Sequence, residues 1–327
     1  MIVDTHVHIW ELPPKAPIGP TAPTWQTLPL SPGTAEELLK DMDENGVDKT
    51  VLVQTSWSTW DNGYIAGSAQ AHRDRFAGHG MIDPLHPDNA DHARHWMDGR
   101  GLRGFRFHPS YYHPSEDAKQ GRPRPSDLRL AEAGFPDGVD ILTMAQNEPM
   151  WQALDERRAL VQVHNRPEDA RQLDAVASRY PRITWLIDHM MYPQPEWAPA
   201  NPLPAGAGAQ ADRGAGEGRY NPLSQRERAG GEGEGKRPKP RLLPYDSVLA
   251  LARHKNVFIK ISDVHGRSKQ RFPYRDMHGI VRQIIAAFGI DRCLWGTGYP
   301  SDRHRAAFHW PSMADELRLV REGFDFL

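Results

Sequence analysis

A pair of histidines one residue apart stands near the start of the chain. His6 and His8 lie in the apolar run IVDTHVHI, residues 2–9. Side chains two residues apart on a strand point to the same side, so Asp4, His6 and His8 are expected to project together toward the interior of the fold. Neutral imidazole nitrogens bind zinc and related divalent metals, which need one or two further ligands. The pair therefore indicates a metal or catalytic site, with hydrogen-bonded structural histidines as the alternative.

Two more histidines lie in apolar runs later in the chain. His164 is in LVQVHNR (160–166) and His189 is in ITWLIDHM (183–190). If these runs are parallel strands of one barrel, their carboxyl ends meet at the same rim as that of the first run. The sequence thus predicts that four histidines share one site, which would hold a divalent metal: zinc, or alternatively manganese or iron.

Short apolar runs that alternate with helix-like segments must position these side chains. Thr34 and Glu37 have the spacing of a helix-capping box, and Gly46 suits the end of that helix. Pro167 suits the first turn of another helix. Eight strand-and-helix repeats with nearly all-buried strands favour an α/β fold, the (β/α)₈ TIM barrel. An open doubly wound sheet is the runner-up, but no glycine-rich phosphate turn follows the first run. The eight runs span residues 2–9, 50–56, 78–84, 102–108, 160–166, 183–190, 257–263 and 293–299.

One segment, residues 198–244, interrupts this rhythm. It is rich in glycine, alanine, proline and charged residues and has few large apolar ones. Such a stretch cannot bury enough surface to offset the cost of ordering it. We expect a single barrel over residues 1–327 with this segment inserted after the sixth strand, on the catalytic face. A disordered insertion without function is the simpler interpretation, and a mobile lid is the other.

The charge balance of the chain argues against two classes of binding partner. The 327 residues include 40 Lys and Arg against 42 Asp and Glu, a formal charge of −2, which argues against nucleic acid or a membrane surface as partner. The single cysteine, Cys293, cannot form an intrachain disulfide, and at the start of the eighth run it is expected to pack in the core rather than act as a nucleophile. We expect a cytoplasmic protein that binds a small-molecule substrate, and a homo-oligomer stays open.

Several motifs together resemble one known family. The His6–His8 pair, VQVHNRPEDA around His164, LIDHMMYP around His189, KIS (260–262) and the final LWGTGYPSD are similar to the amidohydrolase-related group of aminocarboxymuconate-semialdehyde decarboxylase and lactonases. The resemblance covers nearly the whole chain except 198–244. It implies a (β/α)₈ barrel that hydrolyses lactones, amides or related carbonyl compounds, or that decarboxylates. It also implies that His6, His8 and His164 ligate the metal, with His189 as a further ligand or an acid/base residue.

The chain departs from that family at strand eight. The family motif W-G-[ST]-D-[YF]-P carries an aspartate where this chain has Gly298. In the family mechanism that carboxylate ligates the metal and moves the proton of the attacking water, and glycine can do neither. Three hypotheses follow. Asp302, Asp263 or His265 substitutes for it; the site performs altered chemistry such as a lyase reaction; or the barrel is a binding protein.

Other residues at the same rim bear on the substrate. Arg106 and His108 share one face of the fourth run, and Arg166 lies two residues beyond His164. Guanidinium groups bind carboxylates in a planar fork, so these arginines indicate either salt bridges to Asp or Glu on neighbouring loops or an acidic substrate such as a lactone acid. Trp57 and Tyr111 could wall the pocket, as could Trp60 and Tyr112, although aromatic residues there are as often plain packing.

These observations predict a metal-dependent hydrolase that acts on a lactone or amide-like carbonyl, and they leave open whether the substrate is carboxylated. The first alternative is a decarboxylase on the same barrel. The second is a metal-free lactonase or a non-catalytic binder of small molecules.

Overall fold

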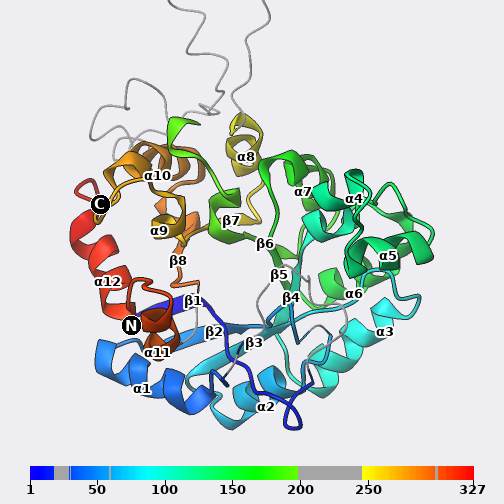
Figure 1. The fold of residues 1–327 in the computed structure, drawn as a ribbon, viewed down its shortest axis with the longest axis horizontal. Coiled ribbons are helices and arrows are strands. Elements are labelled where there is room, and N and C mark those ends of the chain that lie inside the picture. Colours follow the sequence, from blue (N-terminus) through cyan, green and yellow to red (C-terminus); the bar gives the residue numbers. More distant parts are fainter. Residues whose placement is uncertain (18–28, 30, 59, 198–244, 299–300) are drawn as a thin grey trace, which may run out of the picture.

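The computed structural model describes residues 1–17, 29, 31–58, 60–197, 245–298 and 301–327. Eight parallel strands follow one another in chain order around a nearly closed barrel (Figure 1), which confirms the predicted fold. The strands are β1 Val3–Val7, β2 Lys49–Val53, β3 Phe76–Gly80, β4 Gly104–Phe107, β5 Leu160–Val163, β6 Thr184–Ile187, β7 Val257–Ile261 and β8 Cys293–Trp295.

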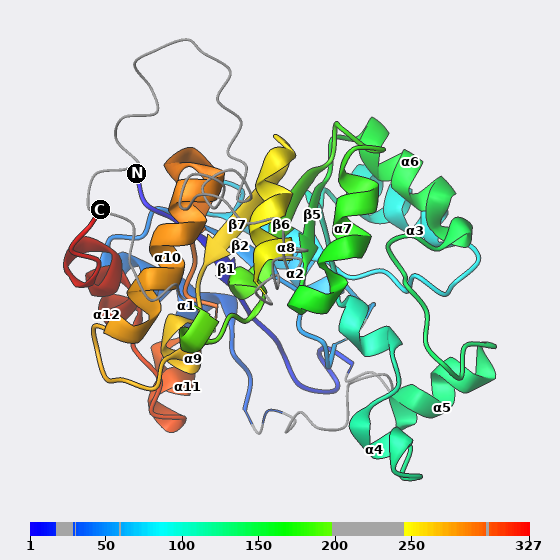
Figure 2. The same ribbon diagram turned by 90° about the horizontal axis from the view of Figure 1, so that it is seen from above.

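Helices surround the barrel, and α4 and α5 stand out from it on the excursion between β4 and α6 (Figure 2). None of the described helices is long and apolar enough to traverse a membrane. The predicted insertion, 198–244, lies outside the described residues. The helices are α1 Ala35–Asn45, α2 Gly63–Ala71, α3 Asn89–Arg94, α4 Glu116–Lys119, α5 Pro125–Glu132, α6 Glu148–Glu156, α7 Ala170–Ala177, α8 Asp246–Ala250, α9 Val264–Arg267, α10 Arg275–Phe288, α11 Asp302–Ala307 and α12 Met313–Arg318.

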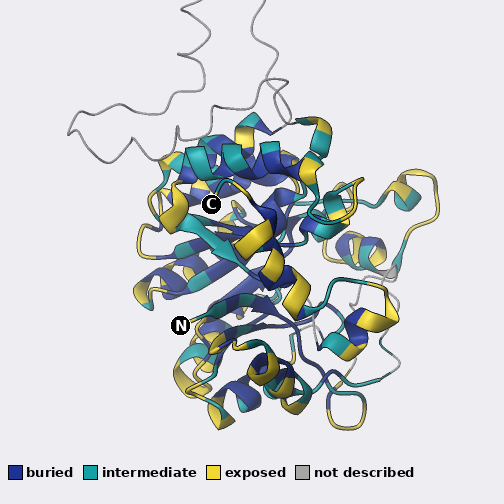
Figure 3. Ribbon diagram, turned by 90° about the vertical axis from the view of Figure 1, so that its left-hand side faces the viewer, coloured by how far each residue is buried: buried dark blue, intermediate teal, exposed yellow. Residues whose placement is uncertain are grey.

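Burial follows the barrel pattern. Most strand residues are buried whichever way they point, while the helices expose their outer faces (Figure 3). The predicted cap of α1 is present: the Thr34 side chain accepts from the Glu37 N–H, and Gly46 ends the helix with φ +68°. Local sequence signals thus form the helices, and burial on both faces holds the strands.

Every strand ends before its predicted run does. The run 183–190 continues three residues beyond the end of β6, and the run 293–299 continues four residues beyond the end of β8. Parallel ladders stop where the chain turns outward at the carboxyl rim, and the remaining residues of each run enter loops. Those loop residues include most of the predicted site.

The seam between β8 and β1 is closed by individual hydrogen bonds, because the described residues form no ladder between these strands. The Thr5 hydroxyl donates to the Trp295 carbonyl at 2.6 Å, and the Gly298 N–H donates to the His6 carbonyl at 2.8 Å. The buried Asp4 carboxylate accepts from the Thr297 N–H at 3.0 Å and from its hydroxyl at 2.7 Å. Asp4 therefore serves the closure of the barrel.

Candidate active site

A cavity of about 950 Å³ opens at the carboxyl ends of the strands. The side chains that line it come from the loops after β1, β2, β4, β5, β6, β7 and β8, so residues far apart in sequence share one chamber. Of the predicted site residues, those in its wall are His8, Trp57, Arg106, Tyr111, His164, Arg166, His189, Asp263 and His265. His6 and His108 lie behind that wall, and Asp302 lies elsewhere.

A buried ion cluster, formed by His6, Arg106, Asp188 and Lys260, adjoins the cavity through Arg106. Asp188 follows β6, and its Oδ1 lies 3.3 Å from His6 Nδ1 and 3.2 Å from Lys260 Nζ. Its Oδ2 accepts a hydrogen bond from Arg106 Nε at 2.8 Å. Burial would raise the pKa of Asp188, but Lys260, His6 and Arg106 together hold it well below its ordinary value. Asp188 is therefore ionised and fixes the direction of the Arg106 guanidinium.

The His6–His8 pair is neutral and hydrogen-bonded. His8 Nδ1 donates to the Val53 carbonyl at 2.7 Å, which leaves its Nε2 facing His6 Nε2 at 3.3 Å. Burial lowers the pKa of His8 to about 3 and that of His6 well below its ordinary value. His6 Nδ1 lies between two partners, 3.4 Å from Lys260 Nζ and 3.3 Å from Asp188 Oδ1, while its Nε2 faces His8. The predicted convergence of two imidazoles is present.

The chain turns left-handed directly after β6. Residues 189–192 all have φ between 48° and 56°, a conformation that costs about 1–2 kcal/mol for each non-glycine residue. The turn brings His189 Nδ1 within 2.9 Å of the Ser262 hydroxyl after β7, and it hydrogen-bonds the Tyr192 hydroxyl to His164 Nε2. The expectation of a strand through residue 190 is wrong at its end, and the strained turn positions two site side chains.

The positions of the histidine nitrogens show whether the site fits the divalent metal that the resemblance implies. His6 Nε2 and His8 Nε2, neutral and 3.3 Å apart, have the spacing of two ligands on one ion. A catalytic zinc takes three protein ligands, however, and no group of three or more His, Cys, Asp or Glu that could hold a metal is present in the described part of the chain. The nearby Arg106 and Lys260 also outnumber Asp188 in charge. The four histidines lie together, but as arranged they do not fit a metal.

Gly298 stands where the family motif carries aspartate. Its φ is +77°, and a Cβ at this position would lie 3.1 Å from His189 Cε1. The His189 imidazole thus fills the space into which a side chain at 298 would extend. Because the preceding Thr297 bonds to Asp4, the described end of β8 serves the barrel seam and brings no carboxylate to the cavity.

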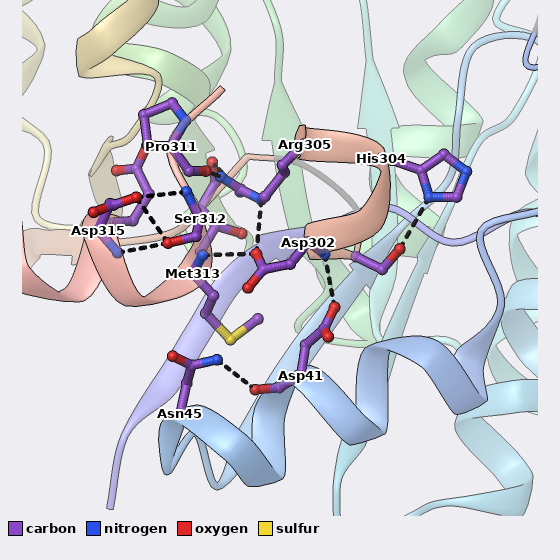
Figure 4. A network of polar contacts seen from close by, with 12 residues as sticks. Asp41, Asn45, Asp302, His304, Arg305, Pro311, Ser312, Met313 and Asp315 are labelled. Atoms are coloured by element: carbon purple, nitrogen blue, oxygen red, sulfur yellow. Dashed lines mark hydrogen bonds and ion pairs between the residues drawn. The ribbon is translucent and has the colours of Figure 1, made fainter. Parts of the chain in front are cut away.

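Asp302, one expected substitute for that carboxylate, does not line the cavity. It lies in a network of polar contacts with Asp41 and Met313 (Figure 4). Its N–H donates to the Asp41 carboxylate at 2.7 Å, and its own Oδ1 accepts from the Met313 N–H at 2.8 Å. The residue begins α11 and links α1 to α12, so its carboxylate is committed to helix ends. Asp263, the other expected carboxylate, lines the cavity, and burial raises its pKa.

The predicted substrate-binding residues divide into two groups. Arg106, Trp57, Tyr111 and Arg166 face the cavity. His108 is buried beneath Tyr111, with the rings stacked at 4.6 Å and 8°, so it supports the wall rather than facing a ligand. A second cavity of about 850 Å³ shares Tyr111 and Arg166 with the first and is also lined by the predicted aromatic residues Trp60 and Tyr112.

Sequence reasoning missed Asp188, the residue that contacts the other three members of the ion cluster. Asp188 and Lys260 stand inside apolar runs, and a charged residue in a run predicted to be buried requires a partner. That signal was available, but it does not identify the partner. Tyr192 and Ser262 carried no comparable signal, because their contacts depend on the turn after β6.

The amidohydrolase family model matches residues 3–208 and 232–320. No curated protein sequence matches the chain. Similar solved structures include a probable 2-pyrone-4,6-dicarboxylic acid hydrolase from Acinetobacter baumannii with citric acid bound, at 14% identity and a TM-score of 0.63, covering 98% of this chain and 91% of that one.

Two further structures have the same fold. An amidohydrolase from Burkholderia multivorans with bound zinc is 15% identical, with a TM-score of 0.61 over 98% of this chain and 90% of its own. A 2,6-dihydroxybenzoate decarboxylase from Rhizobium is 15% identical, with a TM-score of 0.52 over 99% of both chains. Likeness at these identities shows the fold, whereas the family model spans most of the sequence. The chain therefore belongs to the amidohydrolase family of enzymes.

Proposed function

We propose that this enzyme hydrolyses a carboxylated lactone or a related amide-like carbonyl compound. The observation that carries the proposal is the Arg106 guanidinium at the cavity wall. Asp188 holds its Nε, and no other acceptor among the described residues binds the group. Its remaining N–H groups are therefore available to a substrate oxygen.

The charge of the cavity favours an anion. His8 and His189 add no positive charge, because burial lowers the pKa of each to about 3. Arg166 lies exposed at the junction of the two cavities and has no ion-pair partner in the described part of the chain. A fork of N–H donors at this point suits a carboxylate. The similar pyrone dicarboxylic acid hydrolase has a substrate of this class in its name.

Hydrolysis then needs a group that stabilises the oxyanion and a group that moves a proton. Arg106 supplies fixed N–H donors near neutral imidazoles, where developing negative charge on a carbonyl oxygen is stabilised. Asp263 and His265 provide proton-accepting atoms in the same cavity. Water adds to the carbonyl carbon, the ring C–O bond breaks, and the released oxygen takes a proton, which yields a hydroxy acid.

The metal expected from the resemblance is not used in this scheme, because the ligand set is incomplete. Turnover by the purified enzyme should persist after dialysis against 1,10-phenanthroline, with the metal content measured by mass spectrometry. Loss of turnover that returns with added zinc would show that the histidines rearrange around an ion and would contradict this part of the proposal.

A decarboxylase that uses the same cavity is the second candidate, and Gly298 favours it because decarboxylation does not require an attacking water.

The test of both candidates is a screen of lactones that carry one or two carboxylates, each paired with its methyl ester, with acid release and CO₂ release both recorded. We expect hydrolysis of a carboxylated lactone at least about tenfold more efficiently than its ester, since one charge-assisted contact is worth about 1.4 kcal/mol or more.

Two arginine variants test whether Arg166 binds the substrate carboxylate. Arg166→Gln should raise KM about tenfold while kcat changes little, because it removes substrate binding alone. Arg94→Gln, an exposed arginine on α3 away from the cavity, is the matched control. Release of CO₂ without acid would establish the lyase instead, and preference for the uncharged esters would overturn the assignment of an anionic substrate.

A further inference from the structure

A rim triad, formed by Asp263, His265 and Glu316, lies beside the cavity where β7 ends. His265 Nδ1 is 3.1 Å from Glu316 Oε1, and His265 Nε2 is 3.8 Å from Asp263 Oδ1. Asp263 and His265 line the cavity, while Glu316 reaches His265 from α12 behind it and is 3% exposed. Three titratable groups from two distant segments thus form a line that ends at the cavity.

The Glu316 carboxylate determines the tautomer of His265. A carboxylate only accepts hydrogen bonds, so the imidazole must present N–H at Nδ1. The lone pair is then on Nε2, the atom nearer to Asp263. This is the arrangement by which a buried carboxylate orients a histidine that acts as a general base.

The local backbone reserves space for the Asp263 carboxylate. Asp263 has φ +55°, an uncommon conformation for a residue other than glycine. A Cβ on Gly266 would lie 2.3 Å from Asp263 Oδ1, so a side chain at this position would displace that oxygen. Arg267 Nε lies 3.6 Å from the other carboxylate oxygen. The Asp263 carboxylate therefore occupies space that Gly266 leaves open, and the Arg267 guanidinium lies near it.

The gap between His265 and Asp263 suits a water molecule. At 3.8 Å the two acceptor atoms are too far apart for a direct hydrogen bond. A polar gap of this size is commonly bridged by one water, which can donate one hydrogen to each acceptor. A water held in this way faces the cavity with both hydrogens engaged, which is the position that an attacking nucleophile needs.

We propose that Asp263 and His265 are catalytic residues that activate the attacking water, and that Glu316 is a positioning residue for His265. The inference rests on the proposed hydrolase function. It gives Asp263 and His265 the role in moving the proton of the attacking water that the family aspartate, replaced here by Gly298, would have. His265 Nε2 takes a proton as the water oxygen bonds to the carbonyl carbon and the carbonyl electron pair moves to oxygen. When the ring C–O bond breaks, His265 returns that proton to the departing oxygen.

Kinetics on the best lactone of the screen provide the first test. In His265→Ala we expect kcat to fall about 10²- to 10⁴-fold with KM nearly unchanged, the usual contribution of a positioned base. The isosteric Glu316→Gln should lower kcat by about 10²-fold, because the amide no longer enforces the Nδ1–H tautomer. Thermal unfolding of each variant, recorded alongside, verifies that it folds.

A matched control is the imidazole–carboxylate pair of His254 and Asp174, at 2.8 Å and away from the cavity. Asp174→Asn breaks a similar contact and should leave kcat unchanged. If Glu316→Gln behaves like Asp174→Asn, or if His265→Ala keeps its kcat, the triad is structural and the proposal is overturned.

The second test needs no substrate. Nitrogen-15 NMR of labelled protein should show His265 protonated at Nδ1 in the native enzyme and shifted toward Nε2 protonation in Glu316→Gln. A native Nε2–H tautomer would overturn the positioning role of Glu316 whatever the substrate is. A native enzyme with the expected tautomer that hydrolyses no lactone would instead contradict the proposed function, so the two failures are distinguishable.

Discussion

The buried ion cluster and the rim triad each contain a histidine and an aspartate, but the pKa values of the two aspartates are shifted in opposite directions. In the cluster, Asp188 is 0% exposed, contacts three cationic or donor groups, and has a pKa well below its ordinary value. In the triad, Asp263 is 26% exposed and its pKa is raised. A carboxylate surrounded by cations stays ionised, whereas burial without such partners makes a carboxylate more costly to ionise. The cluster therefore supplies a fixed field, and the triad supplies proton transfer.

The largest expected effect comes from neutralising the cluster. Asp188→Asn leaves the buried Lys260 and Arg106 without a counter-charge, which should lower the free energy of unfolding by about 3–5 kcal/mol. Asp263→Asn should change it by less than about 1 kcal/mol, because that side chain keeps contact with solvent. Chemical denaturation of both variants measures the difference. Equal destabilisation by the two substitutions would remove the distinction between the cluster and the triad.

Asp4 shows how burial changes the pKa of a carboxylate whose hydrogen-bond donors are neutral. It is as buried as Asp188, but it accepts mainly from neutral donors, and burial raises its pKa to about 6 from 3.8. A group whose pKa is raised by folding stabilises the protein at low pH and loses that contribution as the pH rises through the folded value. The wild type should therefore lose roughly 2.5 kcal/mol relative to Asp4→Asn between pH 4 and pH 7.

Unfolding curves at several pH values check this prediction for Asp4. Curves for the wild type and Asp4→Asn that stay parallel from pH 4 to pH 7 would contradict it. They would also mean that burial alone does not determine the protonation of the carboxylates around the barrel.

Restoring the family aspartate tests whether the cavity still accommodates it. Gly298→Asp must adopt φ +77° and move His189, so we expect a loss of about 1–2 kcal/mol in stability and lower turnover. Gly298→Ala is the control, since it carries the same strain and the same Cβ without a carboxylate. Turnover above that of the wild type in Gly298→Asp would indicate that the rim triad is not the base.

The smallest effect is expected at Asp302. An asparagine can still accept the Met313 N–H, so Asp302→Asn should cost less than about 1 kcal/mol and leave turnover within about twofold. Asp263→Asn, by contrast, should lower kcat about 10²- to 10⁴-fold. Steady-state kinetics of the two variants compare a carboxylate at a helix end with one in the cavity. A matching loss of turnover in Asp302→Asn would reverse the assignment.

Much of the architecture follows from local sequence. The eight apolar runs and the caps of α1 at Thr34 and Gly46 depend on residues within a few positions of one another, and the structure contains all of them. The approach of His6 to His8 is equally local, because alternation along one strand places both imidazoles on one side. Such features depend on the spacing of residues along the chain, so they can be recognised without knowing where other strands lie.

The partners of those residues were decided only by the closed barrel. Arg106 meets Asp188 from 82 positions away, Lys260 meets His6 from 254, and Glu316 meets His265 from 51. No periodicity encodes these distances, since they depend on the order of strands around the barrel and on the left-handed turn after β6. Spacing along the chain specifies which chemical groups reach the rim. Contacts between strands specify which of these groups are neutralised and which can move a proton, because burial and charge partners come from strands that meet only when the barrel closes.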